Sequence, residues 1–214
     1  MNMKLEWLLV LLVLSNLRLL ASGRLGAKIR TVAAQGILLG LVPLLGSSGH
    51  PGVHAIAIAT AGIVIKGFFF PWLLLRAVRE TRINREVQPY VGYLASVMIG
   101  LAGLAGAFLL SRQLTPLPGA ATSLLVTAAL FSLFTGLFLI VSRKRAINQV
   151  LGFLVLENGV FLFGAGAMGE MSLLVELGIL LDILVAVFVM GITLFHINRE
   201  FDHIETNRLA DLKD

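Results

Sequence analysis

Cysteine is absent from the sequence, and charged residues make up only 14% of it. Without cysteine, the chain can form no disulfide bond, thiolate metal site or iron–sulfur ligation of its own. The sequence also lacks a phosphate-binding loop, a Ser-His-Asp set and the ligand spacing of a metal site. We therefore expect a non-catalytic chain that holds no metal and no cofactor on its own residues.

Long apolar runs dominate what is present. Hydrophobic residues make up 57% of the 214 residues, and the mean hydropathy is +0.93, far above that of a soluble domain. Runs of about 20 such residues can each cross about 30 Å of hydrocarbon as a helix. They lack the alternation of barrel strands, so we predict an all-α, polytopic membrane bundle. The first run has no small-residue cleavage site before Arg18, so we expect no cleavable signal peptide.

The apolar runs divide the chain into seven expected transmembrane helices. They cover residues 5–20, 31–46, 53–75, 89–110, 120–141, 146–167 and 171–195. We group them into an N-terminal four-helix part over 1–111 and a three-helix part over 120–199. A polar cytoplasmic tail over 200–214 closes the chain.

Lysine and arginine gather on alternate sides of these helices. The loops after the first, third and fifth helices and the stretch after the seventh helix, from residue 196 on, hold three, four, three and three of them, or 13 of the 17 in the chain. Only Lys4 and Arg112 lie on the other side. By the positive-inside rule, the N-terminus is expected outside and the C-terminus in the cytoplasm. The net charge of +5 therefore indicates orientation in the lipid bilayer, and no nucleic-acid partner is expected.

The order of these features suggests a weak internal repeat. Helices one to three carry Gln35 and Lys66 in the last two, and helices five to seven carry Glu157 and Asp182 in the same places. In both triplets a basic loop follows the first helix. The alternative is that any bundle with basic loops on one side would show this order.

Ionisable residues inside the apolar runs are the candidate functional site. Glu157, Asp182 and Lys66 lie about 16, 20 and 14 Å from the expected cytoplasmic ends of their helices, so they share the middle of the bilayer. Glu176 precedes Asp182 by about 9 Å and lies on another helix face. A charge at the bilayer centre costs roughly 3 kcal/mol. We therefore predict that these four residues transfer protons.

Each of these residues also has a structural interpretation. Glu157 could be a neutral acid bonded to a neighbouring helix, with Asn158 in the same polar cluster or in a packing contact. Lys66 could be a counter-ion that only stabilises the bundle, paired with Asp182. Glu176 could simply be hydrated near the interface, and Gln35 could join a polar chain or make one interhelical hydrogen bond. Which helices are neighbours does not follow from the sequence.

Several motifs together resemble the hydrogenase-4 component E family. They are an Arg-rich stretch at 143–145, LENG at 156–159, LVELGILLD at 174–182, a tail with Asn207, Leu209, Leu212 and Lys213, and a third helix with Ile65, Lys66 and Pro71. Residues 120–199 also resemble the NuoK subunit of respiratory complex I and the NuoK-like subunits of cation/proton antiporters. The shared pattern is a helix with a central Glu, a short outer loop, and a helix with a central acid that ends in His-x-x-Arg.

This resemblance implies a membrane-arm subunit of a group 4 membrane-bound [NiFe]-hydrogenase of the hydrogenase-4 or formate hydrogenlyase type. Such a subunit is a multi-pass protein of the inner membrane. Its partners would be antiporter-like subunits, other membrane-arm subunits and a peripheral hydrogenase-type arm. That arm would carry the [NiFe] centre and the iron–sulfur clusters. The alternatives are a structural bridging subunit of such a complex, or a part of a multisubunit cation/proton antiporter.

The resemblance also suggests roles for single residues. Glu157 matches the central Glu of the first conserved NuoK helix, and Asp182 matches the acid of the next. NuoK has Glu at that second position, whereas this chain has Asp182 with an additional Glu176. Either residue could therefore take the second role. Lys66 has no NuoK counterpart, because NuoK lacks the first half of this chain.

Overall fold

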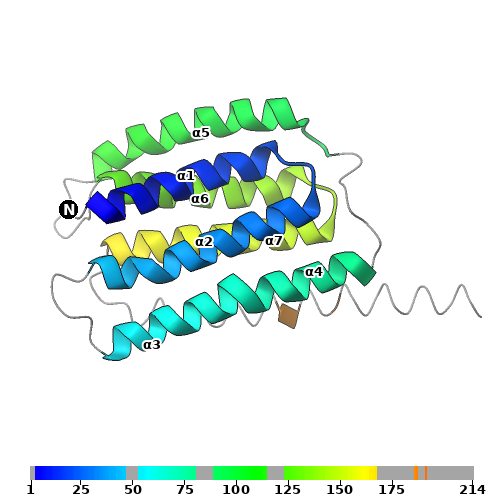
Figure 1. The fold of residues 1–214 in the computed structure, drawn as a ribbon. Coiled ribbons are helices and arrows are strands. Elements are labelled where there is room, and N and C mark those ends of the chain that lie inside the picture. Colours follow the sequence, from blue (N-terminus) through cyan, green and yellow to red (C-terminus); the bar gives the residue numbers. More distant parts are fainter. Residues whose placement is uncertain are drawn as a thin grey trace, which may run out of the picture.

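The computed structural model describes residues 3–46, 53–80, 89–114, 123–167, 186–187 and 191. The elements within these ranges are helices throughout. In chain order they are α1 (Met3–Ala21), α2 (Leu25–Gly46), α3 (Val53–Gly62), the π-helix η1 (Ile63–Phe69), α4 (Phe70–Glu80), α5 (Tyr93–Leu114), α6 (Ser123–Ser142) and α7 (Ala146–Ala167). Because α3, η1 and α4 follow one another without a break, they form one long rod (Figure 1).

Five helical segments in the described residues are long and apolar enough to cross a membrane, which marks the chain as a membrane protein. They cover Leu25–Val42, Ala59–Arg79, Tyr93–Leu114, Ser123–Ser142 and Ala146–Gly164. These segments correspond to the second to sixth expected helices, and α7 has the predicted bounds of 146–167. The first expected helix is contained in α1, whose 19 residues include Lys4, Glu6 and Arg18. Apart from 186–187 and 191, the expected helix over 171–195 lies outside the described residues.

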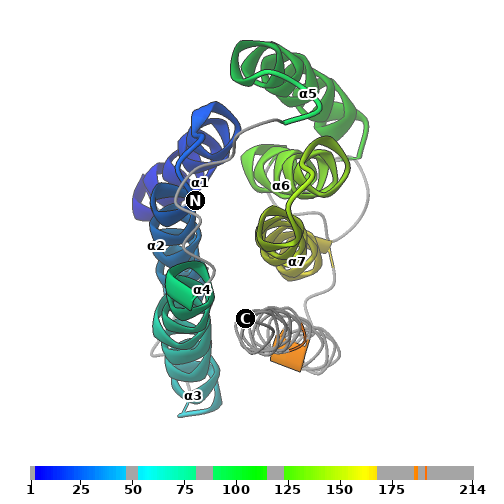
Figure 2. The same ribbon diagram turned by 90° about the vertical axis from the view of Figure 1, so that its right-hand side faces the viewer.

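The helices run side by side in two rows. Seen along the bundle, α1, α2 and the rod form one row, and α6 and α7 lie next to it (Figure 2). α5 packs on α1 and α6, while α2 contacts α1, the whole rod and α7. Successive helices are antiparallel, so the α1–α2 and α6–α7 connections lie at the same end of the bundle (Figure 1). The two rows are therefore joined by α1, which contacts α6, and by α2, which contacts α7.

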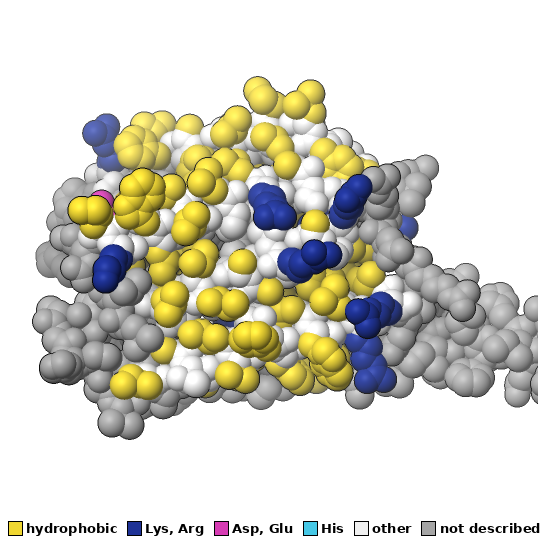
Figure 3. Space-filling view, viewed as in Figure 1, with side chains coloured by type: hydrophobic (Ala, Val, Ile, Leu, Met, Phe, Trp, Pro, Cys, Tyr) yellow, Lys and Arg dark blue, Asp and Glu magenta, His cyan; other side chains and the backbone are white. Residues whose placement is uncertain are grey.

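Basic side chains gather at that same end. On the face shown in Figure 3, Lys and Arg side chains cluster toward the right-hand end, and hydrophobic side chains cover most of the surface between the ends. Arg24 lies in the α1–α2 connection, and Arg79 lies in the last turn of α4. The connection at 143–145 follows α6. We call this the basic end, and the opposite end, with Lys4 and Arg112, the far end.

Aromatic rings lie beneath cations near both ends. At the basic end, Arg76 lies 5.8 Å from the Trp72 ring centroid, and Lys144 lies 4.8 Å from that of Tyr90. At the far end, Arg112 lies 5.3 Å from the centroid of Phe108. Aromatic and basic residues are enriched where transmembrane helices meet the lipid headgroups. The pairs fit a membrane whose two surfaces lie near the helix ends.

The connection between α1 and α2 is shorter than the sequence suggested. Lys28 and Arg30 were expected in a basic loop, but α2 already begins at Leu25. The loop therefore contracts to 22–24, and Lys28 lies in the first turn of α2 with only 1% of its surface exposed. Leu25 and Ile29 are fully buried. Because this apolar face is buried, the helix begins at Leu25, six residues before the start at residue 31 that the basic residues suggested.

The start of the fourth expected helix is also later than predicted, at Tyr93 instead of residue 89. The backbone N–H of Tyr90 donates to the carbonyl oxygen of Ser142 at 3.1 Å, which attaches this segment to the end of α6. Ser123 is the first described residue of α6, so the expected start of the fifth helix at residue 120 lies outside the described residues.

Two separate hydrophobic clusters form the core. The basic-end cluster draws on α1, α2, α4, α6 and α7 and includes Leu20, Ile29, Phe70, Leu139 and Leu151. The far-end cluster draws on α1, α2, α6 and α7 and includes Leu9, Leu39, Ala129 and Leu162. On each of these four shared helices the two clusters are separated by a short interval. Asn16, Gln35, Ser132, Glu157 and Asn158 lie in those intervals.

Candidate functional site

Lys66 occupies the centre of the π-helix in the rod. The segment Ile63–Phe69 is followed by Phe70, whose N–H donates to the carbonyl oxygen of Ile65, five residues earlier. Pro71 comes next. In a regular α-helix the proline ring collides with the carbonyl four residues earlier, so the wider turns ahead of Pro71 accommodate it. π-helical turns are rare and are often found at functional sites.

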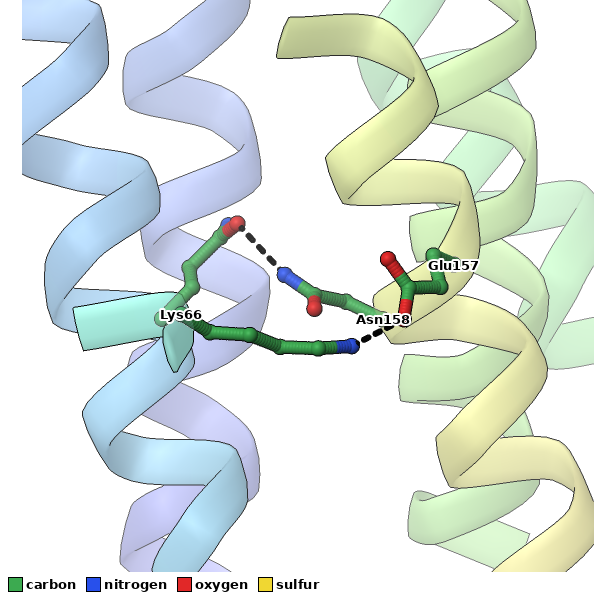
Figure 4. A network of polar contacts seen from close by, with 4 residues as sticks. Lys66, Glu157 and Asn158 are labelled. Atoms are coloured by element: carbon green, nitrogen blue, oxygen red, sulfur yellow. Dashed lines mark hydrogen bonds and ion pairs between the residues drawn. The ribbon is translucent and has the colours of Figure 1, made fainter. Parts of the chain in front are cut away.

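The Lys66 ammonium reaches across to α7 and forms an ion pair with Glu157. Nζ of Lys66 donates to Oε1 of Glu157 (Figure 4). The glutamate side chain is 4% exposed and the lysine side chain 16% exposed. Each charge thereby compensates the other in apolar surroundings, where an uncompensated charge would be expensive. The pair also joins the rod to α7, two elements from opposite halves of the chain.

A chain of buried amide and hydroxyl groups begins beside this pair. Asn158 donates from Nδ2 to Oε1 of Gln35 at 3.5 Å (Figure 4). Gln35 donates from Nε2 to Oδ1 of Asn16 at 2.8 Å and to Oγ of Ser15 at 2.7 Å. Asn16 in turn donates from Nδ2 to Oγ of Ser132 at 2.8 Å. The hydrogen bonds therefore connect α7, α2, α1 and α6 at one level.

That level is the middle of the bundle. Gln35 lies ten residues after Leu25 and eleven before Gly46, and Glu157 lies eleven after Ala146 and ten before Ala167. At 1.5 Å per residue, both are about 16 Å from either end of their helices. The basic-end and far-end clusters lie on the two sides of this level. We call the set the central polar layer: Asn16, Gln35, Lys66, Ser132, Glu157 and Asn158.

A second polar set lies near the basic end. Nζ of Lys28 donates to Oδ1 of Asn148 at 2.9 Å, and both residues are 1% exposed. This bond joins the first turns of α2 and α7. A buried lysine here was not predicted, because the sequence placed Lys28 among the solvated loop charges.

Arg143, which was expected in a basic loop, is also buried. It is fully buried and donates to the carbonyl oxygens of Leu20 and Val91 at 3.3 Å and to Oγ of Ser96 at 3.1 Å. Its guanidinium carbon lies 4.9 Å from the ring centroid of Tyr93. A cation at the carboxyl end of α1 is favourable, because the last carbonyls of a helix carry partial negative charge. Arg143 therefore fastens α1 and α5 to the α6–α7 connection.

Comparison with known proteins adds a family to this geometry. The chain is 33% identical over 208 residues to the uncharacterized protein Rv0085 of Mycobacterium tuberculosis, an alignment that covers 95% of this chain and 93% of that protein. The chain belongs to the Rv0085 family.

More distant similarity links this Rv0085-family protein to proteins named hydrogenase-4 component E. It is 28% identical over 158 residues to the one from Escherichia coli K12, over 72% of each chain, and the one from Shigella flexneri matches to the same extent. No family model matches the sequence. No solved structure matches it either.

The structure brings together two of the four predicted site residues of this Rv0085-family protein, Lys66 and Glu157. The other two, Glu176 and Asp182, lie outside the described residues. Two alternatives were open for Gln35 and for Asn158, and the structure places Gln35 in a polar chain and Asn158 in a hydrogen bond to that chain.

Sequence reasoning missed Ser15, which accepts a hydrogen bond from Gln35, and the remaining members of the two polar sets: Asn16, Lys28, Ser132 and Asn148. Ser15 and Asn16 interrupt an apolar run, which was a usable signal. Among the described residues, no three His, Asp or Glu side chains come together as metal ligands would.

Proposed function

We propose that this chain is a membrane subunit of a hydrogenase-type redox complex in which the Lys66–Glu157 pair transfers protons at mid-membrane. The observation that carries the proposal is the pair itself, a carboxylate and an amine bonded to each other between two apolar clusters. The similarity to hydrogenase-4 component E supports the class of complex. Ionisable groups buried at this depth are expensive and typically serve ion or proton movement.

The chemistry requires only the hydrogen bond that the pair already makes. When a proton moves from Nζ of Lys66 to Oε1 of Glu157, one N–H bond breaks and one O–H bond forms. The ion pair becomes a neutral amine and a carboxylic acid without movement of the helices. Either group can then exchange its proton with a further carrier. Asn158 and Gln35 hold the neighbouring turns of α7 and α2 in place during this exchange.

The proposal also covers the membrane topology, the residues outside the described ranges and the partner subunits. The chain crosses the inner membrane seven times, with the N-terminus outside and the C-terminus and the basic end in the cytoplasm. Asp182 and Glu176 continue the proton path in the seventh helix. Antiporter-like and other membrane-arm subunits adjoin this chain, and a peripheral arm holds the [NiFe] centre and iron–sulfur clusters.

The deciding experiment is replacement of Glu157 by Gln in the assembled complex. A tagged chain is purified in mild detergent, its partners are identified by mass spectrometry, and nickel and iron are assayed. Proton translocation per redox turnover is then measured after reconstitution. The expected result is antiporter-like partners with nickel and iron, and at least a tenfold loss of translocation in Glu157→Gln with assembly retained.

The matched control is Glu6→Gln, which removes an exposed carboxylate at the far end of α1. This variant should translocate protons at the wild-type rate. Unchanged translocation in a correctly assembled Glu157→Gln complex refutes the role of the pair. Antiporter-like partners without nickel or iron would move the chain to a cation/proton antiporter.

A structural role is the second candidate, and one observation favours it. The Lys66–Glu157 pair joins the rod, which belongs to residues 1–111, to α7, which belongs to 120–199. If the acids only hold these parts together, Glu157→Gln should reduce the amount of intact complex. Translocation per intact complex would then stay at the wild-type level.

A further inference from the structure

Lys28 is a buried amine that the proton transfer proposed above does not use. Its side chain lies between the first turns of α2 and α7, where Nζ donates to Oδ1 of Asn148 at 2.9 Å. Only 1% of its surface is exposed, although it lies three residues from the start of α2. The other basic residues of this turn and the preceding loop, Arg24 and Arg30, are exposed. Lys28 is therefore the cation that points inward at the basic end of α2.

The face of α2 that carries Lys28 leads to the central polar layer. Lys28, Thr31 and Gln35 are spaced by three and four residues, so they share one side of the helix. All three are buried. Lys28 and Gln35 both form hydrogen bonds with asparagines of α7, at residues 148 and 158. The α2–α7 interface thus has one polar bridge near the basic end and another at mid-depth.

The side-chain amide of Asn148 is independent evidence that a further group binds beside Lys28. Its Nδ2 is buried and has no hydrogen-bond partner among the described residues, while its Oδ1 accepts from Lys28. Buried amide donors in proteins nearly always have a partner, and ordered water is a common one. The amide can therefore bind a water molecule next to the lysine ammonium.

We propose that Lys28 is the residue through which protons pass between the basic end and the Lys66–Glu157 pair. The inference rests on the proposed proton-transfer function. Lys28 and Gln35 are about 10 Å apart along α2, so the transfer needs intervening water molecules as carriers. The Lys28 ammonium gives one proton to this water, an N–H bond breaks, and the last water gives a proton to the Glu157 carboxylate. The neutral amine then takes a proton from solvent at the basic end.

Substitution by arginine separates this role from a structural one. Arginine retains the positive charge and the N–H donors that face Asn148, but it does not release its proton in proteins. A lysine that only holds α2 against α7 is therefore replaceable by arginine, and a proton carrier is not. Lys28→Gln also keeps a hydrogen-bond donor, in a shorter side chain, but its amide cannot release a proton.

The experiment measures proton translocation per redox turnover in the purified, reconstituted complex. We expect Lys28→Arg and Lys28→Gln to assemble normally and to lose at least tenfold in translocation, with partial recovery in Lys28→His, whose imidazole exchanges protons. Lys144→Gln, which changes an exposed lysine at the same end, serves as the control and should translocate as the wild type does.

Each other outcome contradicts a definite part of the argument. Wild-type translocation in Lys28→Arg overturns the role of Lys28, and so does a failure of both Lys28→Arg and Lys28→Gln to assemble, because the residue is then structural. If only Lys28→Arg fails to assemble, translocation in Lys28→Gln decides: a loss of at least tenfold supports the role of Lys28, and wild-type translocation overturns it. Glu157→Gln is measured in parallel: if it translocates normally the proposed function fails, whereas if it alone is inactive only the inference about Lys28 fails.

Discussion

Gly36 lies directly against the backbone of Lys66. A Cβ atom on Gly36 would lie 2.7 Å from the Lys66 Cβ and 2.8 Å from its carbonyl carbon. The glycine therefore allows α2 to approach η1 closely, immediately next to Gln35. The position of the Lys66 ammonium opposite Glu157 depends on this approach.

Replacement of Gly36 by Ala should push η1 away from α2 and weaken the Lys66–Glu157 pair. The clash is with backbone, which cannot rotate aside, and overpacking of this kind costs about 1–3 kcal/mol. Thermal unfolding of the purified protein in detergent measures the effect. Gly26→Ala on the same helix is the control, because nothing lies within 4 Å of its added methyl group. Equal melting temperatures for the two variants would contradict the prediction.

The contact between α6 and α7 should be equally sensitive at Gly159. A Cβ there would lie 2.6 Å from the backbone nitrogen of Leu133 and 3.0 Å from the carbonyl oxygen of Ala129. Small residues at such crossings let two membrane helices approach closely. We expect Gly159→Ala to lower the yield of folded protein and its melting temperature. Gly106→Ala, on α5 with open space around it, should change neither.

The amide chain predicts non-additive effects at Gln35 and Asn16. Gln35→Leu removes the donor to Oδ1 of Asn16, and a buried polar group left without its partner costs about 1–3 kcal/mol. Once Gln35 is leucine, the additional change Asn16→Leu should cost less than it does alone. A double-mutant cycle on the free energy of unfolding tests this. Strict additivity would show that the two amides do not act together.

The ion pair predicts an asymmetry between single and double substitutions. Lys66→Met leaves the Glu157 carboxylate without its ammonium, and breaking a buried pair in this way typically costs 3–5 kcal/mol. The double variant Lys66→Met/Glu157→Leu removes both charges and should recover much of that stability. It should remain inactive in proton translocation. Recovery of translocation together with stability would contradict the proposed role of the pair.

Much of the fold could be predicted from apolar runs alone. The start of α7 at Ala146 agrees with the prediction, because an apolar segment follows the basic connection at 143–145 directly. The start of α2 was predicted wrongly because a charge is buried there. Lys28 indicated a loop, but its hydrogen bond to Asn148 lets the helix include it.

The site was only partly predictable, for a different physical reason. The depth of Lys66 and Glu157 follows from helical rise, so their common level could be inferred from residue numbers. Their contact depends on which helices are neighbours, which rests on glycine contacts such as that of Gly36 and on the π-helical register before Pro71. Neither of these features can be read from hydropathy.

The division of the core into two apolar clusters with polar groups between them also has an electrical consequence. Apolar material has a low dielectric constant, so most of the membrane potential falls across the two clusters, and the central polar layer lies near half of the total. A proton that moves from the basic end to Glu157 therefore crosses about half of the field, which corresponds to about 1.2 kcal/mol per 100 mV. Protonation of the Glu157 carboxylate then depends on the membrane potential as well as on pH. The sign of the voltage dependence shows from which side of the membrane the proton enters.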